Sequence, residues 1–191
     1  MKRILCLGDS NTFGYDPRSP FGSRYGDDVR WTARLQQAGR EVVNLGQNGL
    51  GIPRAPEFPD LAALLRRLRP LDAVTVMLGS NDLLCGASAE TAAKRMEALL
   101  RFLRSEAEGE RVLLIAPPPM RLGAWVPTRE VIDESVRLAE AYRRLAAELG
   151  VAFADAGDWD AALCFDGVHL SPEGHAAFAK GVEAALAAMG L

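Results

Sequence analysis

The sequence has few histidines, few cysteines and no long hydrophobic run. Its 191 residues include only two histidines, His169 and His175, which nearly excludes a metal site built from several imidazole ligands. Any mechanism that requires an imidazole must therefore use one of these two residues. The three cysteines, Cys6, Cys85 and Cys164, are odd in number and share no metal-ligand spacing, so we expect reduced thiols and a cytoplasmic location.

Charge and hydropathy exclude further classes of protein. The net charge is -3 and the pI is near 5.5, so the chain lacks the basic surface that a nucleic-acid partner requires. No apolar stretch approaches the roughly 18 residues that span a membrane, so we expect no membrane partner. The first apolar run, just after Arg3, is too short for the roughly 7 to 15 apolar residues of a signal peptide, and we expect it to be a strand.

Length and composition are those of a single globular domain over residues 1–191. Hydrophobic residues make up 49% of the chain and charged residues 25%. Short apolar runs alternate with segments of helical periodicity along its whole length. The predicted strands are 3–7, 41–45, 72–78, 111–116 and 151–155. The predicted helices are 28–38, 58–68, 94–104, 129–149 and 172–188, the last of them capped by Ser171.

This alternation predicts an α/β fold. Strands separated by helices form a parallel sheet that is covered on both faces, and right-handed crossovers favour a doubly wound order. We therefore expect a three-layer α/β/α sandwich with a five-stranded, flavodoxin-like sheet. In such a sheet the ligand site lies beyond the carboxyl ends of the strands.

Polar or glycine-rich segments follow the predicted strands. They are 8–12 (GDSNT), 44–49 (NLGQNG), 79–82 (GSND), 117–119 (PPP) and 166–169 (DGVH). Serine needs a base before it becomes a nucleophile, histidine titrates in the right range, and a carboxylate fixes the histidine tautomer. Backbone N–H groups at Ser10 and at a glycine, with the amide of Asn81, suit a developing oxyanion. Taken singly, Ser10 is equally a helix cap and Asn81 a turn residue, but the ordered set favours catalysis.

The ordered set resembles the GDSL or SGNH hydrolases. Residues 8–11 match the first block of that family, with Asn11 where leucine is usual, residues 79–82 match its Gly-x-Asn-Asp, and residues 166–169 match its Asp-x-x-His. The resemblance extends from about residue 8 to residue 175. It implies a three-layer sandwich and ester hydrolysis through an acyl-enzyme without a cofactor. By this likeness Ser10 is the nucleophile, His169 the base and Asp166 its orienting carboxylate.

The second block leaves two candidates for the glycine of the oxyanion hole, Gly46 and Gly49. The family's usual spacing from Asn44 favours Gly49. The expected donors are therefore Ser10, Gly49 and Asn81.

The other polar residues near this edge have simpler expectations. His175 falls on the apolar side of the last predicted helix, which indicates a structural histidine. Asp9, Asp82, Asp155 and Asp166 are carboxylates that Mg²⁺ accepts as ligands, but they form no recognisable metal motif. We expect no metal, and we expect Asp9 and Asp82 to bond loop backbone.

The sequence says less about the substrate. Residues 13–17, 29–32 and 117–119 resemble the bacterial arylesterase and acyltransferase branch, which implies short acyl esters, with alcohols as competing acceptors. Asn11, Trp31 and Trp125 are candidates for the substrate pocket. Tyr15 is a further aromatic residue that could stack on a ring, although aromatic side chains in loops also pack locally.

The sequence leaves alternatives for the role of loop 117–128, for the substrate and for the class of function. The apolar loop 117–128 predicts either a homo-oligomer contact or a loop folded over its own core. The substrate is a small-molecule ester, and an acetylated sugar is the alternative to a simple short-chain ester. A non-catalytic protein that binds acylated sugars is the competing class, but it requires the loss of a catalytic part and none is missing.

Overall fold

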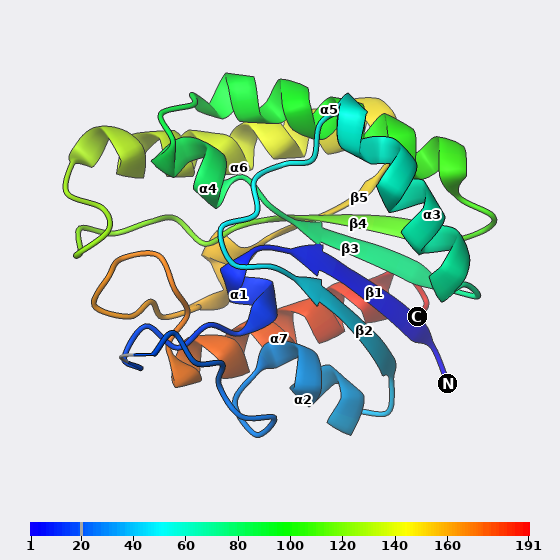
Figure 1. Ribbon diagram of the computed structural model, residues 1–191, viewed down its shortest axis with the longest axis horizontal. Coiled ribbons are helices and arrows are strands. Elements are labelled where there is room, and N and C mark those ends of the chain that lie inside the picture. Colours follow the sequence, from blue (N-terminus) through cyan, green and yellow to red (C-terminus); the bar gives the residue numbers. More distant parts are fainter. Residues whose placement is uncertain (20) are drawn as a thin grey trace.

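Five parallel strands form the central layer of the molecule (Figure 1). The computed structural model describes residues 1–19 and 21–191. The strand order is β2-β1-β3-β4-β5, the flavodoxin-like order that was predicted. The strands are β1 (Arg3–Gly8), β2 (Glu41–Gly46), β3 (Ala73–Met77), β4 (Arg111–Ala116) and β5 (Ala152–Asp155). Each predicted strand is confirmed to within one residue at either end.

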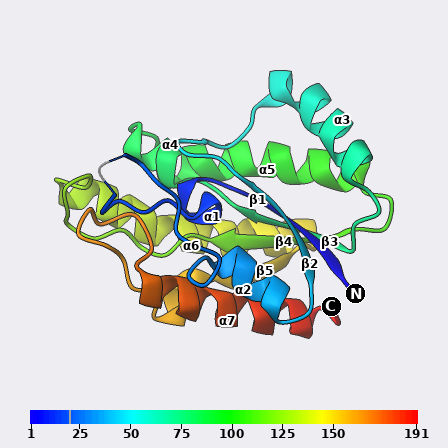
Figure 2. The same ribbon diagram turned by 60° about the horizontal axis from the view of Figure 1, so that its bottom comes forward.

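Helices cover both faces of this sheet, which confirms the three-layer architecture (Figure 2). One face carries α2 (Trp31–Gln37) and α7 (Pro172–Ala188). The other carries α3 (Phe58–Leu68), α5 (Ala89–Glu106) and α6 (Arg129–Leu149). Alternate side chains of β1 enter the two cores, because successive residues of a strand point to opposite faces.

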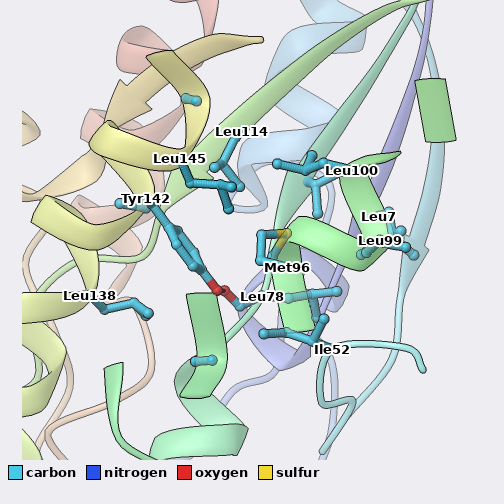
Figure 3. Close-up of a cluster of buried hydrophobic side chains, with 14 of the residues drawn as sticks. Leu7, Ile52, Leu78, Met96, Leu99, Leu100, Leu114, Leu138, Tyr142 and Leu145 are labelled. Carbon is cyan, nitrogen blue, oxygen red and sulfur yellow. Dashed lines mark hydrogen bonds between the residues drawn. The ribbon is translucent and has the colours of Figure 1, made fainter. Parts of the chain in front are cut away.

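The two cores are therefore separated by the sheet. Leu5 and Leu7 pack into the larger one, whose interior is shown in Figure 3, where Leu7 lies near Leu99 and Met96. Ile4 and Cys6 pack into the smaller one. β1 and β3 are buried on both sides, as a central parallel strand requires.

Four helices differ from the prediction. The helix predicted at 28–38 is the shorter α2, which begins at Trp31. The segment 94–104 is the middle of the longer α5, whose N-cap Ser88 accepts a hydrogen bond from the backbone N–H of Thr91. The first turns of α5 bury only small alanines, so the leucine and methionine periodicity did not reveal them. The short helices α1 (Ser10–Phe13) and α4 (Ser80–Leu84) are too brief to show a helical period.

The last helix begins as predicted, since Ser171 accepts from the backbone N–H of Gly174 and Pro172 occupies the first position. In the part of the chain that the structure describes, no helix is both long and apolar enough to cross a membrane. The carboxyl ends of the strands lead into α1, α4 and the polar loops, which together form one edge of the sheet.

Candidate active site

Ser10 begins α1, one residue after the interior strand β1. Asp9 caps this four-residue helix by accepting from the backbone N–H of Asn11 at 2.9 Å. Gly8 is required at the end of β1, because a Cβ there would lie 2.1 Å from Oγ1 of Thr12. The tight strand-to-helix turn therefore fixes the serine at the carboxyl edge of the sheet.

The structure brings the predicted serine, histidine and aspartate together. Ser10 Oγ lies 2.9 Å from His169 Nε2, although the two residues are 159 positions apart in the sequence. His169 Nδ1 lies 2.7 Å from Asp166 Oδ2. An ionised carboxylate only accepts hydrogen bonds, so Nδ1 carries the proton and Nε2 is left to accept from the serine hydroxyl. This arrangement is the one that general-base activation of a serine requires.

Asp166 is held ionised by the same loop that it organises. Its Oδ1 accepts from the backbone N–H groups of Val168 at 2.9 Å and His169 at 3.0 Å. Burial acts to raise the pKa of Asp166, but the hydrogen bonds from the His169 ring and from these two N–H groups outweigh it and lower the pKa. The Asp-x-x-His spacing thus closes a turn and orients the imidazole at once.

The loop after β2 separates the two glycine candidates. The N–H of Gly46 donates to Asn44 Oδ1 at 2.8 Å, and a Cβ at Gly46 would lie 2.0 Å from the backbone nitrogen of Phe13. Gly46 therefore packs β2 against α1. Gly49 has a φ of 74° and open space where a Cβ would be. Among residues 1–19 and 21–191, the N–H groups of Ser10 and Gly49 donate to no protein group, which favours Gly49 as an oxyanion donor.

Asn81 and Asp82 hold this loop from the side of β3. The Asn81 amide donates to the carbonyl oxygen of Leu50, next to Gly49, at 3.0 Å and keeps a second N–H hydrogen. Asp82 Oδ2 accepts from the backbone N–H of Ile52 at 2.9 Å. Three blocks that are distant in sequence are thus joined at one edge.

Asp82 is a buried carboxylate whose other oxygen pairs with Arg95 from α5 at 2.6 Å. Asp82 bonds loop backbone, as expected, whereas Asp9 bonds the first turn of α1 instead. Burial raises the pKa of Asp9 from 3.8 to about 6, partly offset by the N–H of Asn11 and by the nearby His169. Within the described residues, no three acidic, histidine or cysteine side chains group as a metal site.

Two aromatic rings flank the imidazole of His169. The ring of Tyr15 lies 4.7 Å and that of Trp125 4.9 Å from it, centroid to centroid. The backbone N–H of Trp125 donates to the carbonyl oxygen of Asp166 at 3.0 Å, while its side chain is 50% exposed. Trp125 is therefore half exposed beside the base, and its role as a pocket residue stays a prediction.

The other two pocket candidates are corrected by the structure. Asn11 is 3% and Trp31 1% exposed, and the polar atoms of both side chains are bonded to protein groups, so neither is offered to a substrate. Trp31 occupies the first turn of α2. Its ring packs on Phe178, with 5.0 Å between the ring centroids, and its Nε1 donates to the backbone carbonyl oxygen of Asn11. The Asn11 side chain instead binds the loop around His169, a role that sequence reasoning missed.

His175 is buried in α7, in agreement with the structural role expected for it. Its Nδ1 accepts from the backbone N–H of Trp31 at 3.5 Å, and its ring meets Tyr25 edge-on at 5.2 Å. Burial lowers its pKa to about 3, assisted by Arg34 and Arg30.

The loop 117–128 folds back onto the loop that carries the base. The backbone N–H groups of Arg121 and Ala124 donate to the carbonyl oxygens of Gly167 and Phe165. Gly123 approaches so closely that a Cβ would lie 2.3 Å from the carbonyl carbon of Asp166. The loop thus packs on the segment of the base and places Trp125 beside His169.

Comparison with known proteins places this geometry in a family. Residues 6–177 match the model of the GDSL-like Lipase/Acylhydrolase family. A search of curated proteins finds no match. A carbohydrate acetylesterase family member from Sinorhizobium meliloti is 32% identical, with a TM-score of 0.86 over 100% of both chains.

Two further solved structures are similar over nearly the whole chain. Est24, a carbohydrate acetylesterase from Sinorhizobium meliloti, is 27% identical, with a TM-score of 0.85 over 99% of this chain and 100% of that one. The aryl esterase of M. smegmatis is 30% identical, with a TM-score of 0.81 over 96% and 99%. The chain therefore belongs to the GDSL-like lipase/acylhydrolase family and is a carboxylic ester hydrolase.

Proposed function

We propose that this hydrolase cleaves short-chain acyl esters, such as acetyl esters, through an acyl-enzyme on Ser10. The observation that carries the proposal is the continuous hydrogen-bonded chain Ser10–His169–Asp166. The Ser10 hydroxyl lies within hydrogen-bond distance of His169 Nε2, which takes its proton during attack, and the carboxylate stabilises the imidazolium that forms.

In the first half-reaction, Ser10 Oγ attacks the acyl carbon while His169 Nε2 takes its proton. The carbonyl oxygen becomes negative and is met by the N–H groups of Ser10 and Gly49 and by the free N–H of Asn81. Each such donor typically contributes about 2.7–4 kcal/mol to the transition state. The bond to the leaving oxygen then breaks, and His169 returns the proton to that oxygen, which releases the alcohol.

In the second half-reaction, a water molecule takes the place of the alcohol. His169 removes a proton from the water as its oxygen attacks the acyl carbon. When the second intermediate collapses, the bond from the acyl carbon to Ser10 Oγ breaks, His169 returns the proton to Oγ, and the acid is released. An alcohol that enters instead of water receives the acyl group by the same steps. We therefore propose acyl transfer as a second reaction of the same site, favoured when the walls of the site exclude water.

The leaving group lies next to His169, because this residue protonates it. Tyr15 and Trp125 flank that position, and their faces suit an aryl or a sugar ring. The names of the similar structures, an aryl esterase and carbohydrate acetylesterases, support the same two classes. An acetylated sugar is thus the second candidate substrate. A binding protein without catalysis is disfavoured by the complete hydrogen-bonded chain.

The proposal is tested with p-nitrophenyl esters of increasing acyl length. We expect a burst of p-nitrophenol from the acetate, covalent labelling of Ser10 by a fluorophosphonate, and falling rates for longer acyl groups. Added alcohols should increase turnover and yield the new ester. A wild-type protein that shows neither a burst nor a label, behaving like Ser10→Ala, would contradict the proposal.

The three free thiols support a cytoplasmic location for the activity.

A further inference from the structure

Asn11 joins the helix that carries the nucleophile to the loop that carries the base. Its Nδ2 donates to the carbonyl oxygen of Val168 at 3.1 Å, and its Oδ1 accepts from the backbone N–H of Leu170 at 2.8 Å. These two groups lie on either side of His169, so a single side-chain amide is hydrogen-bonded to the backbone both before and after the base. We propose that Asn11 is a positioning residue that holds His169 in place during turnover, and above all in the acyl-enzyme.

The other hydrogen bonds of His169 do not connect its loop to α1, the helix that carries the nucleophile. Asp166 bonds both the ring and the backbone N–H of His169, but both residues belong to one loop. These bonds fix the shape of the loop and not its distance from α1. Among the described residues, the side-chain hydrogen bonds between α1 and residues 163–170 are those of Ser10 and Asn11.

The bond from Ser10 to His169 cannot persist through the reaction. Once Ser10 Oγ carries the acyl group, it has no proton to donate, and His169 must instead bind the incoming water. At that stage the Asn11 amide supplies the remaining side-chain tether between α1 and the loop. Deacylation therefore depends on Asn11 more than acylation does.

Asn11 is itself immobilised, which a tether requires. The backbone carbonyl oxygen of Asn11 accepts from Nε1 of Trp31 at 3.0 Å, and the ring of Trp31 is packed on Phe178. An apolar side chain of the same size at position 11 leaves the Val168 carbonyl and the Leu170 N–H buried without partners. Both groups then gain by moving toward water, which draws the loop away from α1.

The kinetic test rests on the proposed function and compares Asn11→Leu with the wild type on p-nitrophenyl acetate. In an acyl-enzyme mechanism kcat/KM reports acylation, whereas kcat reports deacylation when that step limits. We expect kcat to fall about tenfold more than kcat/KM, so that KM falls too. Equal falls in kcat and kcat/KM, or no change in either, would overturn the proposal.

A matched variant separates positioning from general loss of stability. Asp72 Oδ2 accepts from the backbone N–H of Arg3 at 2.8 Å, at the opposite end of the sheet. Asp72→Ala also removes a side-chain bond to backbone, but it should leave KM unchanged. A lower KM in Asp72→Ala would show that the kinetic signature follows destabilisation.

A second measurement does not depend on activity. In Ser10→Ala the serine bond is absent, and we expect amide hydrogen exchange in residues 163–170 to stay slow. Adding Asn11→Leu should accelerate that exchange about tenfold, whereas adding Asp72→Ala should not. Equal exchange in Ser10→Ala and in its Asn11→Leu double variant would refute the tether. A wild type without a burst would count against the proposed function alone, because the exchange result still decides the role of Asn11.

Discussion

At the scale of single residues, the two histidines show how environment assigns roles. Both are buried, but only His169 contacts a serine and a carboxylate. His175 lies among aromatic and backbone groups of the smaller core, and burial lowers its pKa to about 3. It is therefore neutral at any pH at which an esterase works, and it serves packing.

We accordingly predict that His169→Ala lowers kcat for p-nitrophenyl acetate by about three orders of magnitude or more. His175→Ala should keep most of kcat but unfold more easily, because it opens a cavity in the smaller core. Steady-state rates and urea unfolding of the two variants check this pair. Similar rates for both variants would contradict the assignment of the base.

Asp9 is the second residue whose burial has a measurable consequence. Because the pKa of the carboxyl is raised from 3.8 to about 6, the folded state binds its proton more tightly than the unfolded state does. This stabilising contribution is complete below pH 4 and is lost as the pH rises through 6. An ionised Asp9 therefore costs stability at neutral pH, while its charge favours the imidazolium of His169.

Asp9→Asn keeps the cap of α1 without the charge. We predict that it raises the free energy of unfolding at pH 7 by roughly 1–3 kcal/mol and has little effect at pH 4. The same change should lower kcat, because the imidazolium loses a nearby negative charge. Urea titrations at both pH values, with kcat at pH 7, test this. A variant that is less stable at pH 7 would show that the Asp9 carboxylate stabilises the fold.

At the scale of elements, the sequence revealed the strands best and the short helices least. Five apolar runs bounded by turn residues marked the sheet, and the rule that ligands bind at the carboxyl ends identified the functional edge. The four residues of α1 and the alanines that open α5 carry no usable periodicity, so their limits depend on caps and tertiary packing. Trp31 was predicted to lie in a helix, but its burial depends on packing against Phe178 of α7, which the periodicity of so short a helix does not reveal.

The loop after β2 gives a prediction at this scale, because its two glycines serve different purposes. Gly46→Ala places a methyl group against the backbone of α1 and should destabilise the fold by about 1–3 kcal/mol or more. In Gly49→Ala the new methyl group meets no neighbour, but a φ of 74° is strained for alanine. This strain costs about 1–2 kcal/mol and changes the direction of the N–H at position 49.

Gly49→Ala should therefore lower kcat more than its loss of stability explains, whereas Gly46→Ala should do the reverse. Thermal unfolding and turnover of p-nitrophenyl acetate by the two variants measure this difference. The opposite ranking would make Gly46 the oxyanion glycine.

At the scale of the whole molecule, exposed apolar side chains form a rim on one side of the site, on loops 117–128 and 163–170. Leu122 is 57%, Trp125 50% and Phe165 64% exposed, and hydrogen bonds between loops 117–128 and 163–170 join them into one surface. A surface of this kind either binds substrate or covers a neighbouring subunit. Loop 117–128 does fold onto its own chain, through its hydrogen bonds to residues 165–167, and the oligomer stays a prediction.

We predict a mass in solution that is a multiple of 20.6 kDa. Light scattering after size exclusion measures it, and Phe165→Ser should shift the mass toward that of one chain, because it puts a polar group in the expected interface. The exposed Val136 lies on α6 rather than on the rim, so Val136→Ser is the control. A wild-type mass of one chain would exclude the oligomer.

The contact between Ser10 and His169 also bears on how the protein becomes active. Its two partners are separated by 159 positions, so the loop that it closes contains most of the chain. Neither a growing polypeptide on the ribosome nor a partly refolded intermediate possesses the site until β1 and the segment before α7 have docked. Recovery of esterase turnover after dilution from denaturant should therefore trail the recovery of helical circular dichroism, and so mark the last step of folding.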